Sequence, residues 1–311
     1  MPIGLGLACS HVPNMFIPPE DWDRRYKQAI GDVPQPLAAA AETLEVRRGY
    51  AKRIDAGFDA LRARLAAYKP DVLIMITDDH GETFDREACM PTIAMFTGSS
   101  GTGNLALVFE GRNDGSADVT LKCHRELAQY LSWGLVKRDF DIAIMSSDKV
   151  KALGVPERGM GHGFTRTAPK IMPKLDVPTV MFWLNCYYEP LPTARRCIEL
   201  GRAIAEVAKD RPERIAIFGT GGLSHDPRGP RGGWIDEPLD RFVLDAFAKG
   251  EPDRLQSLFE FDSDTLRGGT GEIRNWLVVG GAMGATKADI IDYMPIHSAI
   301  AGIGFAAWGG K

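Results

Sequence analysis

The sequence predicts an α/β fold in a single domain: a central, mostly parallel or mixed sheet flanked by helices, with a cleft at the strand ends. Two observations support this prediction. Short runs of buried-strand character alternate along the chain with longer runs of helical periodicity. Several of the predicted strands lead directly into a glycine-flanked loop that contains a histidine. Because no repeat or low-complexity linker marks a boundary, we treat residues 1–311 as one domain.

The predicted strands are short apolar runs bounded by loop residues. They cover residues 3–9, 71–77, 92–96, 142–145, 177–184 and 215–218. The predicted helices have apolar residues at helical spacing. They cover residues 36–68, 119–136, 193–209, 238–248, 252–258 and 271–279. The first helix is expected to present one apolar face, made by Leu44, Ile54, Phe58, Leu61 and Leu65.

Local signals mark three further segments. Pro192 and the hydroxyl of Thr193 predict the start of the helix over 193–209. Residues 98–104 are rich in Gly, Ser and Thr but lack the GxxxxGK[ST] pattern of a phosphate-binding loop, so we interpret them as a surface loop. The small residues at 280–282 permit close packing of the last predicted helix.

Composition narrows the class of protein. Hydrophobic residues make up 44% and charged residues 25% of the chain, as in ordinary globular enzymes. A net charge of −4 with no basic cluster argues against nucleic acid as a partner. The five cysteines are widely spaced without a CxxC pair, which indicates reduced thiols and a cytoplasmic location. No apolar run approaches the roughly 20 residues of a membrane span, so we expect no membrane partner.

The most informative stretch is Gly219-Thr220-Gly221-Gly222-Leu223-Ser224-His225. A buried-strand pattern precedes it, and its three glycines let the backbone adopt positive φ and approach a ligand closely. Three other histidines lie in similar settings: His11 and His80 follow predicted strands, and His162 has a glycine on each side. Ligands collect at the carboxyl ends of strands in α/β sheets. Together, these imidazoles are typical of a metal or acid–base site.

Each histidine alone is more often a hydrogen-bonded structural residue than a ligand. That interpretation holds for His124, which lies in a predicted charged helix. No HExxH or zinc-finger spacing is present, so a metal site would be assembled from distant segments.

Four motifs together resemble the class III (LigB-type) extradiol ring-cleaving dioxygenases, which include the catalytic subunit of protocatechuate 4,5-dioxygenase and the gallate and methylgallate dioxygenases. In chain order they are Ser10-His11-Val12-Pro13, Asp79-His80 after a buried strand, the 219–225 motif, and Gly271-Glu272 followed by Trp276 and Gly281-Ala282. The resemblance covers nearly the whole chain. The GTGGxSH element is its most specific part.

The resemblance implies that Fe(II) is bound by His11, His80 and Glu272. Two histidines and one carboxylate leave three positions open on iron, enough for both catechol oxygens and O2. Without the resemblance, Glu272 would be interpreted as a carboxylate favoured at a helix N-terminus by the helix dipole.

The resemblance also implies two catalytic histidines. His225 matches a residue that exchanges protons with the catechol and the bound oxygen. His162 matches a second acid, although its glycine neighbours depart from the Asp-His pair usual in the family.

Substrate contacts are expected from two segments. His297 and Ser298 lie where the family contacts the ring substituent of its substrate. The arm 18–35 lengthens the gap between the first two histidines and could form a built-in lid, with Trp22 stacking on the substrate ring. Packing of Trp22 and Tyr26 against a neighbouring helix or subunit is an equal alternative. A built-in lid would make a small capping subunit unnecessary, and we expect a homo-oligomer.

The expected function is therefore Fe(II)-dependent extradiol cleavage of a catecholic aromatic acid, such as protocatechuate, gallate, methylgallate or a related lignin-derived catechol. Two alternatives stay open at this point. One is a zinc hydrolase that uses the same ligands to activate water. The other is a non-catalytic relative that serves as an interaction module.

Overall fold

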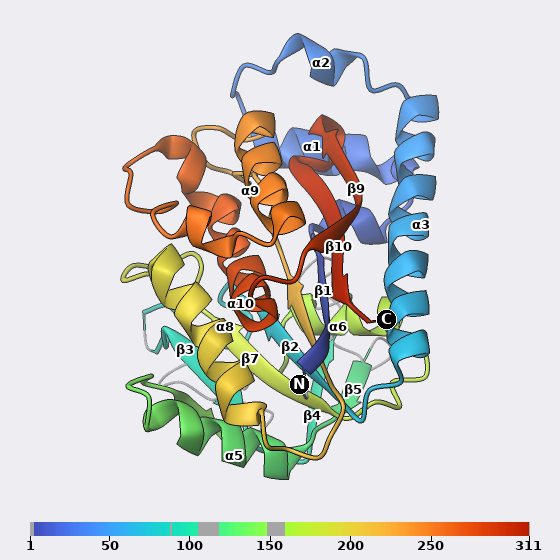
Figure 1. The fold of residues 1–311 in the computed structure, drawn as a ribbon. Helices are drawn as coiled ribbons and strands as arrows, with labels where there is room; N and C mark the ends of the chain where they lie inside the picture. The colour runs from blue at the N-terminus through green and yellow to red at the C-terminus, as the bar shows by residue number, and fades with distance from the viewer. Residues whose placement is uncertain (1–2, 88, 105–117, 148–158, 311) are drawn as a thin grey trace.

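A computed structural model describes residues 3–87, 89–104, 118–147 and 159–310 of the chain. Its centre is an eight-stranded mixed sheet in the order β6-β3-β7-β2-β8-β1-β10-β9 (Figure 1). The strands of this sheet are β1 (Ile3–Cys9), β2 (Val72–Thr77), β3 (Ile93–Phe96), β6 (Ala143–Met145), β7 (Thr179–Leu184), β8 (Ile215–Thr220), β9 (Ala288–Ile296) and β10 (Ala301–Gly309).

The four middle strands are parallel, and each flank joins them through an antiparallel pair. Strands β7, β2, β8 and β1 run parallel to one another. β3 pairs antiparallel with β7, while β10 pairs antiparallel with both β1 and β9. The predicted mostly parallel or mixed sheet is therefore confirmed as a mixed one. Because the central strands are covered on both faces, they are continuous runs of buried apolar residues.

Helices cover both faces of the sheet. One face packs against α5 (Arg125–Val136), α8 (Ala194–Ala208), α9 (Glu237–Lys249) and α10 (Ile273–Met283). The other packs against α3 (Leu44–Tyr68), α6 (His162–Thr165) and α7 (Ala168–Ile171). The helices α1 (Trp22–Ile30) and α2 (Leu37–Ala40) lie at the end of the molecule drawn uppermost in Figure 1.

Short 3-10 turns complete the connections. They are η1 (Pro13–Phe16), η2 (Pro19–Asp21), η3 (Pro252–Leu255), η4 (Asp264–Leu266), η5 (Gly268–Glu272) and η6 (His297–Ala299).

The glycines predicted to permit close packing bring α10 against α8. A Cβ at Gly281 would lie 2.2 Å from the carbonyl oxygen of Ile198, and one at Gly201 would lie 1.9 Å from that of Val278. Neither distance is tolerated by a real side chain, so both helices need glycine at the crossing. This crossing fixes α10, whose N-cap residue Glu272 lies at the strand ends.

Three sequence predictions about local structure are wrong. Residues 98–104 are not a surface loop, because β4 (Ser100–Asn104) pairs antiparallel with β5 (Asp118–Lys122). The predicted helix over 119–136 is wrong at its start, because residues 119–122 belong to β5. Buried and exposed residues alternate along β5, as in a strand with one covered face. The predicted helix over 36–68 is two helices, since Thr43 caps a fresh start at α3 and leaves Leu44 36% exposed.

Other predictions of local structure are confirmed. Ile54, Phe58, Leu61 and Leu65 are buried on one face of α3, and the Thr193 hydroxyl caps α8 by accepting from the N–H of Arg196. The five cysteines, all of them in the described ranges, are free thiols. Residues 149–158, which precede the glycine-flanked His162, lie outside the described residues.

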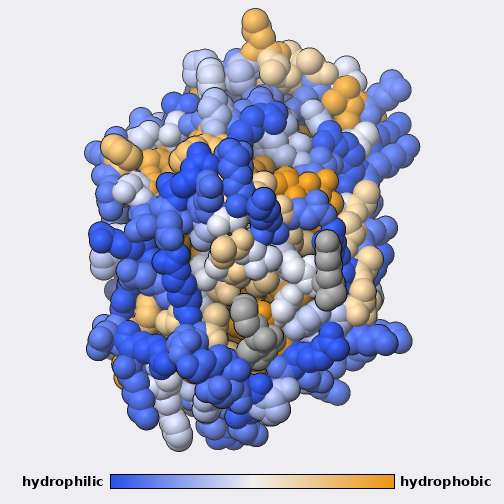
Figure 2. Space-filling model, in the orientation of Figure 1, coloured by the Kyte–Doolittle hydropathy of each residue, from blue (hydrophilic) through white to orange (hydrophobic). Residues whose placement is uncertain are grey.

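The surface in Figure 2 is largely hydrophilic, with apolar residues exposed over α2 at the upper end. Leu37 of that helix is 93% exposed. In the described part of the chain, every helix is too short or too polar to cross a bilayer.

Candidate metal centre

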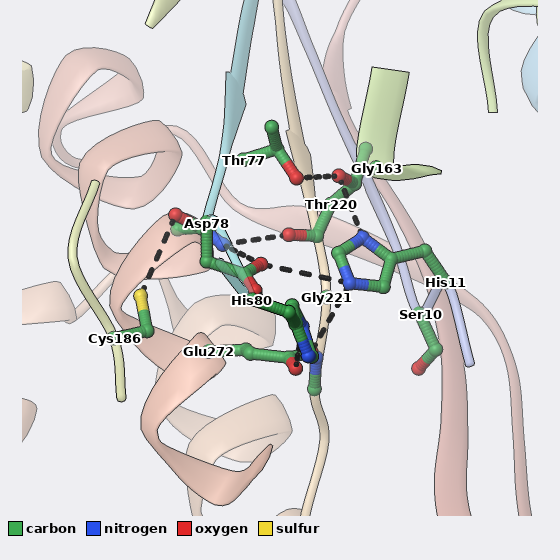
Figure 3. Close-up of polar contacts among 12 residues, drawn as sticks. Ser10, His11, Thr77, Asp78, His80, Gly163, Cys186, Thr220, Gly221 and Glu272 are labelled. Atoms are coloured by element: carbon green, nitrogen blue, oxygen red, sulfur yellow. Dashed lines mark hydrogen bonds and ion pairs between the residues drawn. The ribbon is translucent and has the colours of Figure 1, made fainter. Parts of the chain in front are cut away.

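The candidate site lies where β2, β8 and β1 end side by side. These three strands are parallel neighbours, so their carboxyl ends meet at one edge of the sheet. His11 follows β1, Asp78 and His80 follow β2, and the 219–225 motif follows β8. Glu272 reaches the same point from the start of α10. Figure 3 shows these side chains turned toward one another around Gly221.

Four side chains bring their ligand atoms within 4.8 Å of one another: His11, Asp78, His80 and Glu272. His11 Nε2 lies 3.5 Å from an oxygen of each carboxylate, and His80 Nε2 lies 3.2 Å from Glu272 Oε1. Both carboxylates are fully buried. The structure thus brings together all three predicted metal ligands and adds Asp78, which the sequence analysis did not propose.

His11 is oriented by two threonines. Its Nδ1 lies 3.0 Å from the hydroxyl of Thr220, which in turn donates to the hydroxyl of Thr77. Because the proton of the Thr220 hydroxyl is directed at Thr77, the Thr220 oxygen accepts a hydrogen bond from Nδ1–H of His11. The proton of His11 is therefore on Nδ1, and its Nε2 keeps a lone pair. Burial lowers the pKa of His11 to about 4, although the carboxylates oppose this shift. A neutral imidazole with a free Nε2 is the form that binds metal.

Glu272 is held by a phenol and a backbone amide. Its Oε1 accepts from the hydroxyl of Tyr187 at 2.5 Å, and its Oε2 accepts from the N–H of Gly222 at 2.6 Å. Gly221 and Gly222 have φ of +121° and +59°, and a Cβ at Gly221 would lie 2.7 Å from Glu272 Oε2. Glycine is therefore required in this turn, as the motif predicted.

Charge interactions keep this carboxylate ionised. Burial alone would raise the pKa of Glu272, but the interactions with the surrounding histidines, His225 first among them, outweigh it and hold the pKa well below the ordinary value. For His80, burial opposes the charged form, yet the carboxylates of Asp78 and Glu272 hold its pKa well above the usual value. Burial, reinforced by Glu272, raises the pKa of Tyr187 well above 10, so the phenol stays a donor.

His225 stands beside the four clustered side chains. Its Nδ1 lies 2.9 Å from the carbonyl oxygen of Leu223, which can only accept, so Nδ1 carries the proton. Its Nε2 then faces Glu272 Oε1 at 3.5 Å. A Cβ at Gly269 would lie 2.0 Å from that nitrogen, so the backbone of η5 packs directly on the ring. A pocket opens next to His225, lined by residues of 224–236 and by Asp264, Thr265 and Thr270.

His162 lies beside His11 and His80, with its ring centroid 4.7 Å from that of His11 and 4.9 Å from that of His80. Glu82 accepts from its backbone N–H at 2.5 Å and lies 2.6 Å from its Nδ1. Burial would raise the pKa of Glu82, but His162 outweighs it and lowers the pKa to about 2. The family usually has an aspartate directly before this histidine, whereas position 161 is glycine in this chain. Glu82 supplies a carboxylate to His162 instead. Gly163 is needed because a Cβ there would lie 1.9 Å from the Thr77 hydroxyl.

The predicted substrate contacts lie in η6 and at the start of α1. In η6, the backbone N–H groups of His297 and Ser298 donate to the two carboxylate oxygens of Glu42. The hydroxyl of Ser298 is buried without a hydrogen-bond partner among the described residues. Trp22 is 1% exposed and its indole donates to the carbonyl of Ile17. Contact between any of these three and a substrate stays a prediction.

The arm 18–35 packs against the segment that lines the pocket. Ala29 accepts from the N–H of Arg228, Gln35 donates to the carbonyl of Gly232, and the carbonyl of Pro34 accepts from the indole of Trp234. The arm therefore lies against one wall of the opening beside His225.

The donor set fits a divalent metal ion. His11 Nε2, His80 Nε2 and Asp78 Oδ2 are buried, and no hydrogen-bond partner for them exists in the described residues. Buried polar atoms are normally satisfied, and buried charges are paired or bind metals. A divalent cation between these atoms would satisfy all three and balance both carboxylates.

Four residues of this site were missed in the sequence. Asp78 directly follows β2 and Tyr187 lies three residues after the end of β7, so the signal that singled out the histidines could have found them. Thr220 lies inside the recognised motif but was interpreted only as a turn residue. Glu82 had no signal, because its link to His162 depends on the folded path of both loops.

Comparison with known proteins identifies the family. Residues 9–306 match the family described as the catalytic LigB subunit of aromatic ring-opening dioxygenase, and the chain therefore belongs to it. The resemblance inferred from the motifs is confirmed.

Characterised relatives are distant. The chain is 26% identical over 301 residues to a 2,3-dihydroxyphenylpropionate/2,3-dihydroxicinnamic acid 1,2-dioxygenase of Photorhabdus laumondii, and the match covers 81% of this chain and 88% of that enzyme. It is 29% identical over 168 residues to a gallate dioxygenase of Pseudomonas putida. That match covers 52% of this chain and 46% of the relative, or about half of its length.

A solved structure shares the fold. An uncharacterised protein of Escherichia coli K12 superposes with a TM-score of 0.51 at 15% identity, over 98% of this chain and 100% of that one. At this identity the likeness concerns the fold alone.

Proposed function

We propose that this protein is an Fe(II)-dependent extradiol dioxygenase that opens the ring of a catecholic aromatic acid next to its two hydroxyls. The observation that best supports the proposal is the convergence of His11, His80 and Glu272, two imidazoles and one carboxylate, within 4.8 Å at the strand ends. Membership of a family described by aromatic ring opening agrees with it, as do relatives named for catecholic substrates.

In this proposal His11, His80 and Glu272 hold the iron. The iron supplies, when bound, a centre at which a catechol and O2 come together. Tyr187 and Gly222 orient Glu272, and Thr220 orients His11. Such outer hydrogen bonds fix the direction and protonation of metal ligands.

The proton transfers belong to two histidines next to the cluster, one beside Glu272 and the other beside His11 and His80. His225 has its proton on Nδ1, so its Nε2 can accept a proton from a catechol hydroxyl and return it later. His162, held by Glu82, is the second proton-transfer group. Burial of both rings excludes water from these steps.

The substrate ring is proposed to enter beside His225. Arg231 lines that pocket and offers a guanidinium to a carboxylate on the ring. His297 and Ser298 would contact the ring substituent. The arm 18–35, which hydrogen-bonds to the pocket wall, would act as the lid in place of a separate capping subunit. Trp22, if it meets the substrate, must turn out of its buried position.

We place the enzyme in the cytoplasm as a homo-oligomer.

The test is oxygen uptake by protein loaded anaerobically with Fe(II). Protocatechuate, gallate, methylgallate and 2,3-dihydroxyphenylpropionate form the substrate panel, and product mass after reaction with ¹⁸O₂ is the second readout. We expect both oxygen atoms in a ring-opened product of at least one substrate, and none with Zn(II)-loaded protein. Absence of ring opening across a broad catechol panel, from protein shown to contain stoichiometric iron, would refute the proposal.

Replacing Glu82 with glutamine should lower kcat while metal content and KM stay near the wild-type values. The neutral amide still accepts one hydrogen bond but no longer stabilises a charged His162. We expect a loss of about tenfold or more, smaller than the ~10²–10⁴-fold typical of removing a proton-transfer group itself. Steady-state kinetics with metal analysis measures both effects. Glu82→Asp should recover part of the rate, and an equal rise in KM instead would assign Glu82 to substrate binding.

A further inference from the structure

We propose that Asp240 is a positioning residue for His225, which it holds through the peptide group between Leu223 and Ser224. This inference rests on the proposed proton transfer by His225 and adds to it a carboxylate that the proposed function does not use. Asp240 lies in the first turn of α9, and this helix lies beside β9 and β10 (Figure 1). The residue is 0% exposed.

The Leu223–Ser224 peptide group connects Asp240 to the imidazole. On one side, its N–H donates to Asp240 Oδ1 at 2.8 Å. On the other, its carbonyl oxygen lies 2.9 Å from His225 Nδ1 and accepts the proton of that nitrogen. Carboxylate, peptide and imidazole therefore form one chain of hydrogen bonds, whose members polarise one another. The negative charge at the N–H end makes the carbonyl at the other end a better acceptor.

A second contact fixes the same turn. Asp240 Oδ2 accepts from the hydroxyl of Ser224 at 2.9 Å, so the two carboxylate oxygens hold both the side chain and the backbone of that residue. The Ser224 hydroxyl in turn accepts from the N–H of Asp236 at 2.9 Å. This two-point contact opposes rotation of the peptide group, and such a rotation would carry its carbonyl away from His225.

Gly302 of β10 holds the turn from the other side. Its carbonyl accepts from the N–H of Leu223 at 2.8 Å, and its N–H donates to the carbonyl of Ser224 at 3.0 Å. A Cβ at this position would lie 2.0 Å from Asp240 Oδ2, so the absence of a side chain makes room for the carboxylate. Gly302 thus contributes neutral backbone bonds to the turn, and Asp240 contributes the charge.

Asp240 is ionised at neutral pH although it is buried. Burial raises its pKa to about 6, while hydrogen bonds from Tyr293 and Ser224 oppose this shift. The Tyr293 hydroxyl donates to Oδ2 at 2.8 Å. In the described part of the chain, the nearby cation Arg241 pairs with Glu237 at 3.3 Å and not with Asp240. Burying a charge without a paired cation is costly, so stability of the fold does not by itself account for Asp240.

Helix capping does not account for it either, although negative charge is favoured at a helix N-terminus. The cap of α9 is Asp236, whose carboxylate accepts from the N–H of Leu239 at 3.1 Å. The oxygens of Asp240 instead accept from residues outside α9. Two of these three hydrogen bonds come from Ser224, the residue directly before His225.

The consequence concerns the state of His225 in the proposed reaction. While the proton stays on Nδ1, Nε2 has a lone pair that can take a proton from the substrate. Without the carboxylate, the peptide carbonyl is a weaker acceptor, and the tautomer with its proton on Nε2 becomes populated. Because that tautomer cannot accept a proton at Nε2, loss of Asp240 should slow the proton transfer and leave metal and substrate binding in place.

The experiment compares Asp240→Ala and Asp240→Asn with the wild-type protein. Alanine removes both the charge and the acceptors, whereas asparagine keeps an acceptor for the Ser224 N–H without the charge. Tyr293→Phe is the matched control, because it removes a hydrogen bond to the same carboxylate and leaves the contact with Ser224.

Two sets of measurements are made on the full-length chain. ¹⁵N NMR of labelled histidine in the metal-free protein, at an alkaline pH where imidazole is neutral, reports the tautomer of His225. The variant His225→Gln assigns its signal. Metal content, kcat and KM of the Fe(II)-loaded protein form the second set.

We expect the proton of His225 on Nδ1 in the wild-type protein and in Tyr293→Phe, and a mixture of both tautomers in Asp240→Ala. Removing a proton-transfer group itself costs ~10²–10⁴-fold, so losing its positioning should lower kcat by about 10–100-fold in Asp240→Ala. Asp240→Asn should recover part of this loss, because it keeps a hydrogen bond of about half the strength of a charge-assisted one. Metal content and KM should stay near the wild-type values in every Asp240 and Tyr293 variant.

A proton on Nε2 of His225 in the wild-type protein would overturn the proposal, and this measurement does not depend on the folding of a variant. The proposal would also fail if tautomer and kcat were unchanged in the Asp240 variants that fold. An equal loss of kcat in Tyr293→Phe would reduce Asp240 to a residue that packs α9 against β9. If the tautomers respond as expected but iron-loaded protein opens no catechol ring, the proposed function fails while the positioning of His225 by Asp240 stands.

Discussion

Replacing Glu272 with alanine abolishes metal binding and, with it, ring-opening activity. Glu272 lies within 3.5 Å of His11 and His80, the two proposed ligand histidines, and its removal leaves the proposed centre without the carboxylate at the start of α10. The affinity loss should exceed the 10–100-fold typical of outer partners, and turnover should fall to background. Metal analysis after anaerobic loading, together with oxygen uptake, measures the two effects.

A glutamine at this position separates the metal effect from a folding defect. Alanine leaves the Tyr187 hydroxyl and the Gly222 N–H without an acceptor, at a cost of about 1–3 kcal/mol for each unsatisfied group. Glutamine keeps an acceptor oxygen of similar reach but carries no charge. We therefore expect Glu272→Gln to melt near the wild-type temperature in the metal-free state and still to bind metal weakly. Wild-type affinity in Glu272→Gln would remove Glu272 from the ligand set.

Replacing His225 with glutamine leaves the metal bound and lowers kcat by about 10²–10⁴-fold, the usual contribution of a proton-transfer group. His225 Nε2 lies 3.5 Å from Glu272 Oε1, and His225 is not one of the four side chains whose ligand atoms lie within 4.8 Å of one another in the described residues. Iron content, kcat and KM on the best substrate give the result.

His124 provides the matched control for this substitution. Its Nδ1 caps α5 by accepting from the N–H of Leu127, a role that asparagine performs well. His124→Asn should therefore retain stability, metal and turnover. If the His225 variant loses iron in proportion to activity, His225 is a ligand and the assignment of roles changes.

The location of the site could be predicted from the sequence, because it depends on a simple rule of parallel sheets. His11, His80 and the 219–225 motif each follow a buried strand, and β1, β8 and β2 proved to be neighbours. The order of strands was not predicted. Because the strand order was unknown, only the family resemblance predicted that Glu272 lies close to His11 and His80.

The parts that could not be predicted depend on pairings between distant segments. β4 and β5 are each short and polar, and their strand character arises from pairing with one another. Strands β9 and β10 were not proposed, although together they form one edge of the main sheet. Glu82 is a single carboxylate of a common kind, and only its folded position beside His162 distinguishes it from a surface residue.

The residues that converge at the strand ends come from both ends of the chain, and this has a consequence for how the protein matures. His11 and Thr220 are 209 residues apart, and Asp78 and Asn275 are 197 residues apart. Contacts of such high sequence separation form late and slowly in folding. Only the native arrangement presents the full ligand set, so the metal would bind the folded chain and not the unfolded one. At a free metal concentration 100 times Kd, this binding would add about 2.7 kcal/mol to the free energy of unfolding. Scarcity of the metal would then reduce the amount of folded protein as well as the activity of each molecule.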